Sequence, residues 1–249
     1  KHLQRNLEVS YKCAYRILFC IRKVLKQNDT KLKGDVEIDT GYLGGKGDAV
    51  LIAHDWGAVT AYGALSVEPW RWQRAVIGNV PSFAVFGQLA FSYAQLKRSF
   101  YFWFFQMAIA EGVVAANDLA FIDGLWGDWS PGYNATYDLG RVKECLRNPE
   151  NLRAAMGYYR TMFNPAHFGT PEGVAEQTAT WGNPVTVPTL YLHGTTDGCI
   201  ALDAETAKAI PAFLGPESEV ERIEGVGHFF LVEKPSEINE RILRFLQRG

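Results

Sequence analysis

Residues 49–65 constrain the fold most, because they predict a strand, a sharp turn and a helix in direct succession. The apolar run Ala-Val-Leu-Ile at 49–52 follows glycine-rich sequence and is typical of a buried strand in a parallel sheet. Residues 59–65 form a run rich in Val, Thr, Ala and Tyr that is compatible with a helix. The turn between them, Ala53-His54-Asp55-Trp56-Gly57-Ala58, is therefore expected at the carboxyl end of the strand.

Further strand and helix signals alternate along the chain, which indicates an α/β fold with a mostly parallel sheet and helices on both faces. Strand-like runs occur at residues 75–80, 185–192 and 219–223. Pro188 is expected to be the first residue of its strand, and a helix is expected near 204–210. A closing helix is predicted from apolar positions that share one face: Ile238, Ile242, Leu243, Phe245 and Leu246.

The chain divides into three parts. Residues 35–81 and 183–249 are expected to form the core, and residues 82–182 contain helical spacings without a convincing strand, so they predict a helical lid inserted between two strands. Residues 1–34 hold nine Lys/Arg against two Asp/Glu and are interpreted as a basic helix. The apolar stretch of this N-terminal segment is too short and too charged to span a bilayer.

Composition argues against several classes of function. The net charge of −2 argues against nucleic-acid binding by bulk electrostatics, and a hydrophobic content of 47% is ample for a core. No phosphate loop or dinucleotide motif occurs. Cysteine spacing does not suggest a zinc cage or a disulfide framework, the four residues being Cys13, Cys20, Cys145 and Cys199. We therefore expect no metal and no cofactor, and a reducing cytoplasmic location.

Residues 53–57 match the small-x-nucleophile-x-small pattern of a nucleophile elbow, with Asp55 in the position that serine occupies in esterases. The small residues allow strand and helix to approach closely through a strained turn, which lifts the central side chain out of the sheet. The backbone N–H of Trp56, at the start of the helix, would face an oxyanion formed there. The alternative interpretation is an ordinary turn in which Asp55 caps the helix.

An aspartate nucleophile needs a base and an acid that orients the base, and candidates for both follow predicted strands. Asp197 and His228 lie in the loops after the two strands that follow the helical lid. Because the carboxyl ends of parallel strands share one edge of a sheet, the sequence predicts a triad of Asp55, Asp197 and His228. Asp203 is the alternative acid. Two histidines lie so close to strand ends that they are interpreted as structural: His54 and His193.

From about residue 48 to 249, the sequence resembles the α/β-hydrolases of the epoxide hydrolase branch. The resemblance rests on the His-Asp-Trp-Gly elbow at 54–57, the loop that carries Asp197, the Gly-His pair at 227–228, and two tyrosines of the predicted lid.

The two tyrosines separate this resemblance from haloalkane dehalogenases, which share the elbow. Tyr101, five residues before Gln106, matches the first lid tyrosine of the branch, and Tyr159 matches the second. Tyr158 is the neighbour that could exchange roles with Tyr159. The alternative interpretation of these tyrosines is core packing in an aromatic-rich segment.

The resemblance implies hydrolysis of a small apolar epoxide by water to a 1,2-diol. Asp55 would attack an epoxide carbon to form a covalent ester, while Tyr101 and Tyr159 donate hydrogen bonds to the epoxide oxygen. His228, oriented by Asp197, would then activate water as a general base. Three apolar residues are expected to contact the substrate: Trp56, Phe105 and Phe229.

The sequence departs from this family before residue 48. Complete members have several strands before the nucleophile strand, and a His-Gly-x-Pro loop among them supplies the second oxyanion donor. The first 48 residues contain no such motif. We therefore expect the N-terminal strands to be largely absent, as in a truncated or mis-joined gene product. A catalytically silent fragment and a haloalkane dehalogenase are the alternatives to an epoxide hydrolase.

Overall fold

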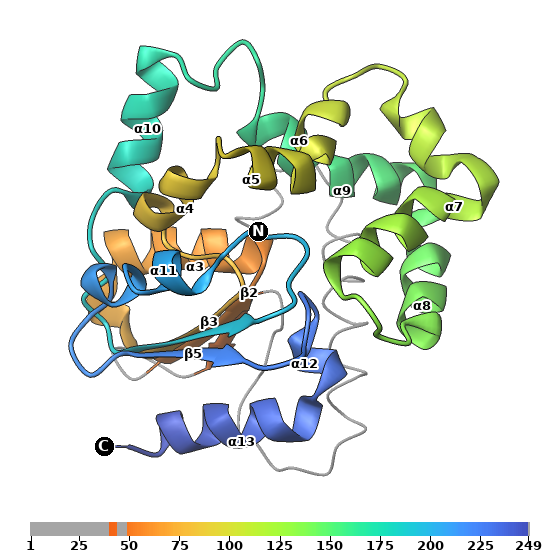
Figure 1. Ribbon diagram of the computed structural model, residues 1–249. Helices are drawn as coiled ribbons and strands as arrows, with labels where there is room; N and C mark the ends of the chain where they lie inside the picture. Colours follow the sequence, from red (N-terminus) through yellow and green to blue (C-terminus); the bar gives the residue numbers. More distant parts are fainter. Residues whose placement is uncertain (1–39, 44–48, 249) are drawn as a thin grey trace.

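The computed structural model describes residues 40–43 and 49–248, which form a five-stranded sheet surrounded by helices (Figure 1). The strands lie side by side in chain order; the first pairs antiparallel with the second, and the remaining pairs are parallel. They are β1 (Thr40–Leu43), β2 (Ala49–His54), β3 (Trp72–Gly78), β4 (Thr189–Gly194) and β5 (Glu219–Ile223). The expected mostly parallel α/β sheet is confirmed. The predicted basic helix at 1–34 lies outside the described residues.

Helices cover both faces of the sheet, because successive side chains of a strand point to opposite sides. Ile77 of β3 packs in a buried cluster with α3 (Trp56–Val67), whereas Val76, one residue earlier, packs with α13 (Pro235–Leu246) on the other face. The shorter elements of the core are η1 (Pro69–Arg71), α11 (Ala204–Ala207), η2 (Ile210–Phe213) and α12 (Phe230–Glu233).

Between β3 and β4 the described chain forms helices and no strand, as the sequence predicts for this segment. In Figure 1 these helices gather at one end of the molecule, beyond the sheet. Three of them, α6, α7 and α9, bury a cluster of their own that includes Phe105, Leu125 and Met156. The helices are α4 (Phe83–Leu89), α5 (Tyr93–Arg98), α6 (Phe100–Phe104), α7 (Ala110–Trp129), α8 (Thr136–Leu146), α9 (Pro149–Met162) and α10 (Pro171–Trp181).

Some predicted boundaries differ from the structure. The strand predicted at 185–192 begins only at Thr189, because Pro188 has no N–H to pair and lies just before the strand. Val185 and Val187 are apolar because they are buried in the cluster on the α3 face, although they lie outside the strand. The helix predicted at 204–210 divides into α11 and η2, with Pro211 in the first turn of η2.

Strand β5 and helix α13 match the elements predicted from the spacing of apolar residues. β5 spans the residues predicted for it, and Ile238, Ile242 and Phe245 of α13 are buried, as expected for one face of a helix. Strand β1 is not predicted: residues 40–43 lie in a segment interpreted as turn-rich, yet they pair with β2.

None of the helices among the described residues combines the length and apolar character needed to cross a bilayer.

Candidate active site

Asp55 occupies a strained turn between β2 and α3. Its backbone has φ 52° and ψ −120°, a conformation that costs a non-glycine residue about 1–3 kcal/mol. The Asp55 N–H donates to the carbonyl of Gly78 at 3.3 Å, and the Asp55 carbonyl accepts from the N–H of Val59 at 3.2 Å. Ala53 and Ala58 are buried, so strand and helix pack closely. The Asp55 side chain makes no capping hydrogen bond to α3, which contradicts the helix-cap alternative.

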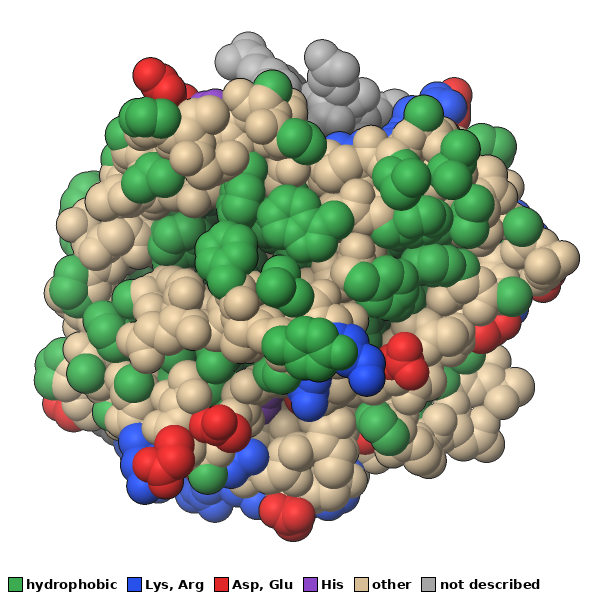
Figure 2. Space-filling view, turned by 45° about the horizontal axis from the view of Figure 1, so that its top comes forward, with side chains coloured by type: hydrophobic (Ala, Val, Ile, Leu, Met, Phe, Trp, Pro, Cys, Tyr) green, Lys and Arg blue, Asp and Glu red, His purple; other side chains and the backbone are tan. Residues whose placement is uncertain are grey.

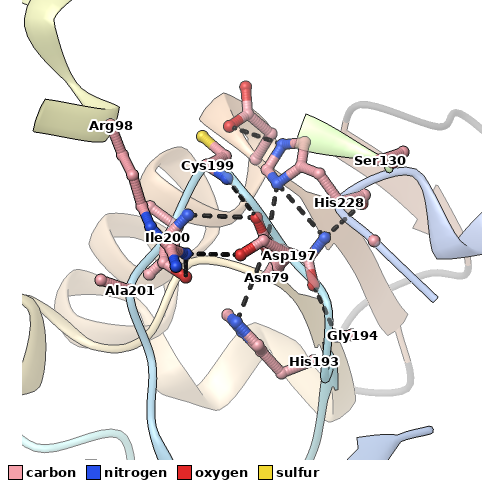
Figure 3. A network of polar contacts seen from close by, with 12 residues as sticks. Asn79, Arg98, Ser130, His193, Gly194, Asp197, Cys199, Ile200, Ala201 and His228 are labelled. Carbon is pink, nitrogen blue, oxygen red and sulfur yellow. Dashed lines mark hydrogen bonds and ion pairs between the residues drawn. The ribbon is translucent and has the colours of Figure 1, made fainter. Parts of the chain in front are cut away.

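His228 lies between two carboxylates. Its Nε2 is 3.3 Å from Oδ1 of Asp55. Its Nδ1 is 3.1 Å from Oδ2 of Asp197 (Figure 3). The side chains of His228 and Asp197 are each 1% exposed, whereas that of Asp55 is 34% exposed. One carboxylate is therefore accessible, and the other is sealed behind the ring.

The loop after β4 holds the Asp197 carboxylate with backbone hydrogen bonds. Its Oδ1 accepts from the N–H of Cys199 at 2.6 Å and from that of Ile200 at 3.1 Å. Arg98 of α5 donates to the carbonyls of Asp197 and Ile200, at 2.5 and 3.0 Å (Figure 3). The acid is thus held by its own loop and by the helical segment that covers that loop.

Asp203, the alternative acid, and the two histidines interpreted as structural do not lie between the two carboxylates, although Nε2 of His193 comes within 3.6 Å of Oδ2 of Asp197. Asp203 is exposed and caps α11, so it is not beside the imidazole of His228. Nε2 of His54 lies 2.9 Å from the carbonyl oxygen of His228. Nδ1 of His193 lies 2.9 Å from the hydroxyl of Tyr191 within β4. His54 and His193 therefore make contacts within the core, and the ring of His228 bridges the two carboxylates.

The two predicted lid tyrosines meet near Asp55. The ring centroids of Tyr101 (α6) and Tyr159 (α9) are 5.4 Å apart, and Tyr159 contacts Trp56 edge to face at 5.1 Å. Both tyrosines line the same cavity as Asp55. Tyr158 contacts the Trp56 ring at 5.7 Å but is not among the described residues that line this cavity.

The cavity has a volume of about 330 Å³ and is mostly apolar. Its walls come from α3, α4, α6, α9 and α10, and Asp55 is the one charged side chain among the described residues that line it. Figure 2 shows apolar side chains gathered on the face formed by the α4–α10 helices. Five of the described large apolar residues that line the cavity are exposed, among them Phe91 at 66% and Val174 at 51%. The cavity therefore suits an uncharged, apolar ligand.

Of the three expected substrate contacts, Trp56 lines the cavity. Phe105 instead lies in the buried cluster of the α6, α7 and α9 helices, with its ring centroid 5.2 Å from that of Tyr159. Phe229 stacks on Trp126 at 3.9 Å. Both phenylalanines pack against aromatic residues instead of facing the cavity, so the structure does not support their expected role.

Comparison with known proteins agrees with this architecture. The model of the alpha/beta hydrolase family matches residues 27–241. This chain belongs to the α/β-hydrolase family. Epoxide hydrolase 1 of Caenorhabditis elegans is 28% identical to this α/β-hydrolase over 208 residues, which are 80% of this chain and 48% of that protein. Epoxide hydrolase 4 of Homo sapiens is 25% identical over 211 residues, 82% of this chain and 54% of that protein.

The α/β-hydrolase thus spans about half the length of these curated relatives, both of which are epoxide hydrolases by name. Among solved structures, an epoxide hydrolase from Bacillus megaterium superposes with a TM-score of 0.64 at 22% identity, covering 81% of this chain and 70% of that chain. At that identity the superposition shows the shared fold.

Burial and charge set the protonation states of Asp55, Asp197 and His228 in this α/β-hydrolase. Burial disfavours the imidazolium, but Asp197 and Asp55 outweigh it and raise the pKa of His228 to about 10. Burial alone would raise the pKa of both aspartates, but the hydrogen bond and charge of His228 hold the pKa of Asp55 and of Asp197 below the ordinary value. In the resting site, His228 therefore carries a proton between two carboxylates.

The surrounding groups remain neutral. Burial lowers the pKa of His54 and of His193 to about 4, so neither is charged at neutral pH. Burial, with the nearby charge of Asp55, raises the pKa of Tyr101 and Tyr159 well above the ordinary value. Both tyrosines therefore keep their protons and can donate hydrogen bonds into the cavity.

Two residues beside Asp55 and His228, Asn79 and Cys199, are not predicted from the sequence as part of the site. Asn79, fully buried after β3 at φ 62°, donates through its amide to the carbonyl of His228 and accepts from the N–H of Gly194 at 3.3 Å. A polar residue directly after a predicted strand is the signal that could have identified it. Cys199 follows Asp197 by two residues and lines the cavity. Its spacing from the other cysteines does not indicate a role in the site.

Proposed function

We propose that this α/β-hydrolase converts an apolar epoxide to a 1,2-diol through a covalent ester on Asp55. The observation that carries the proposal is that the carboxylate of Asp55 and the rings of Tyr101 and Tyr159 line one apolar cavity, with His228 behind the carboxylate. The helices α4–α10 act as a lid in this proposal, since α6 and α9 supply the two tyrosines.

In the first step, an oxygen of Asp55 attacks an epoxide carbon, and the bond from that carbon to the epoxide oxygen breaks. The oxygen becomes an alkoxide, which Tyr101 and Tyr159 stabilise by donating hydrogen bonds that strengthen as the charge develops. The ester removes the negative charge of Asp55, so the pKa of His228 falls. The proton of His228 neutralises the alkoxide by way of the tyrosines, which leaves a neutral imidazole and a hydroxy ester.

In the second step, neutral His228 takes a proton from water, and the hydroxide attacks the ester carbonyl. The backbone N–H of Trp56, which helps to hold the pKa of the Asp55 carboxyl below its ordinary value, would stabilise the oxyanion. Collapse of the tetrahedral intermediate breaks the ester bond to the diol oxygen, which takes the remaining proton of the attacking hydroxide. The diol then leaves, with Asp55 again a carboxylate and His228 again protonated. Asp197 holds Nδ1 of His228 throughout, which keeps Nε2 directed at the reacting centre.

A variant that forms the ester but cannot hydrolyse it tests the proposal. His228→Gln is incubated with styrene oxide and examined by intact mass and peptide mapping. We expect a mass gain equal to one epoxide on the peptide that contains Asp55. The matched control, His228→Gln with Asp55→Ala, is expected to stay unmodified. An unmodified His228→Gln protein, or an adduct that persists in the control, would contradict the proposal.

A further inference from the structure

Three potential metal ligands of different chemistry converge on the cavity. A carboxylate oxygen of Asp55, Sγ of Cys199 and a ring nitrogen of His228 all lie within 4.8 Å of one another. They come from the loops after β2, β4 and β5, and Figure 3 shows Cys199 next to His228 and Asp197. The proposed hydrolysis uses the aspartate and the histidine but gives the thiol no task.

The spacing of these atoms is close to that of a tetrahedral zinc site. Zinc bonds of about 2.0–2.2 Å to nitrogen and oxygen and about 2.3 Å to sulfur place N and O about 3.4 Å apart, and S about 3.6 Å from either. The Nε2 of His228 and Oδ1 of Asp55 are already 3.3 Å apart. Since the three atoms lie within 4.8 Å of one another, the thiol of Cys199 would have to approach by up to about 1.2 Å.

The partners around the ligands also suit a metal. A histidine that binds zinc usually donates its other ring N–H to a carboxylate, and Nδ1 of His228 faces Asp197 at 3.1 Å. The backbone N–H of Cys199 is held by the same carboxylate at 2.6 Å, and its Sγ lies 3.4 Å from the hydroxyl of Tyr101. Thiolate, imidazole and carboxylate together favour zinc and cadmium over magnesium or calcium, which prefer oxygen ligands.

We propose that Asp55, Cys199 and His228 bind one zinc-class divalent cation, and that the bound ion blocks the active site. The cation replaces the thiol proton of Cys199 and the Nε2 proton of His228, and both protons pass to the buffer. It occupies the carboxylate oxygen and the ring nitrogen that the hydrolysis needs, and its fourth position faces the cavity. Metal binding is inferred from the geometry of the three ligands alone, whereas inhibition by the metal depends on the proposed epoxide hydrolysis.

Cadmium binding to the intact chain tests the site directly, because cadmium thiolates absorb in the ultraviolet. The variant with Cys13, Cys20 and Cys145 all changed to Ser leaves the proposed ligands untouched. We expect it to bind one equivalent of Cd²⁺ with a thiolate absorption band that zinc suppresses, that magnesium does not, and that EDTA abolishes. Adding Cys199→Ser to this variant should remove the band. Absence of the band in the variant that retains Cys199 would overturn the proposal.

Inhibition is measured in a separate experiment. For each protein, we determine the zinc concentration that halves the rate of epoxide hydrolysis measured without metal. We expect Cys199→Ser to raise that concentration by about tenfold or more relative to Cys145→Ser. Equal inhibition of the two variants would overturn the inhibitory role. If no epoxide is turned over at all, the proposed function fails while the cadmium titration still decides whether the metal site exists.

Discussion

Nε2 of His228 lies 3.3 Å from Oδ1 of Asp55, although the two residues come from loops at β5 and β2. The contact places an imidazole directly behind the carboxylate that is open to the cavity. Because of this contact, the negative charge of Asp55 helps to keep His228 protonated. In the proposed mechanism, formation and breakdown of an ester on Asp55 are therefore coupled to the proton on His228.

Replacement of the buried acid is expected to slow breakdown of the ester. Asp197→Asn keeps the shape of the side chain but removes the charge that orients and supports His228. We expect turnover to fall by about 10²–10⁴-fold, with the ester accumulating in single-turnover experiments. Asp203→Asn is the matched control, because Asp203 caps α11 at the surface. Equal losses in both variants would contradict the assignment of Asp197.

Removal of one phenolic hydroxyl is expected to slow ester formation. Tyr101→Phe and Tyr159→Phe preserve the ring contacts but each deletes a donor to the epoxide oxygen. Each is expected to reduce the rate of ester formation by up to about 10²–10³-fold, measured under single-turnover conditions. Tyr158→Phe should change this rate little. If all three variants behave alike, the tyrosines serve packing and not catalysis.

Asn79 is expected to matter for stability. It is fully buried, and its amide holds the His228 backbone and the N–H of Gly194 together. Asn79→Ala leaves those groups unsatisfied and puts alanine at φ 62°, so the free energy of unfolding should fall by about 1–3 kcal/mol. Urea denaturation measures this loss, and an unchanged midpoint would show that the contacts contribute nothing.

The two chemical steps should depend differently on pH when EDTA excludes metals. Asp55 has a lowered pKa and the tyrosines have raised pKa values, so ester formation should be flat between about pH 6 and 9. Ester breakdown needs neutral His228, whose pKa of about 10 falls once Asp55 is esterified. Breakdown should therefore speed up as pH rises and level off below about pH 10. Rapid-quench measurements separate the steps, and the reverse pattern would contradict the mechanism.

The elbow and the order of strands could be predicted from the sequence because each depends on local features. Small residues around Asp55 and apolar runs before each loop identify the carboxyl edge of the sheet without knowledge of the fold. Asp197 could not be separated from Asp203 in this way, since both follow β4. The structure distinguishes them by contact, because the carboxylate of Asp203 caps α11.

Features that depend on how loops and helices converge could not be predicted. Residues 100–105 are all aromatic, so no periodicity separates Tyr101, which lines the cavity, from Phe105, which is buried in the same cluster but does not line the cavity. Cys199 approaches Asp55 and His228 only because three separate loops meet. The strand at 40–43 escaped prediction because its partner, β2, determines its conformation more than its own residues do.

A single turnover of a styrene oxide substrate in ¹⁸O-labelled water tests the central claim most directly. With enzyme in excess, we predict that the first diol carries no label, because its new oxygen comes from Asp55. The ¹⁸O should appear in the Asp55 carboxylate instead. Label in the first diol and none in Asp55 would show direct attack by water and would contradict the covalent mechanism.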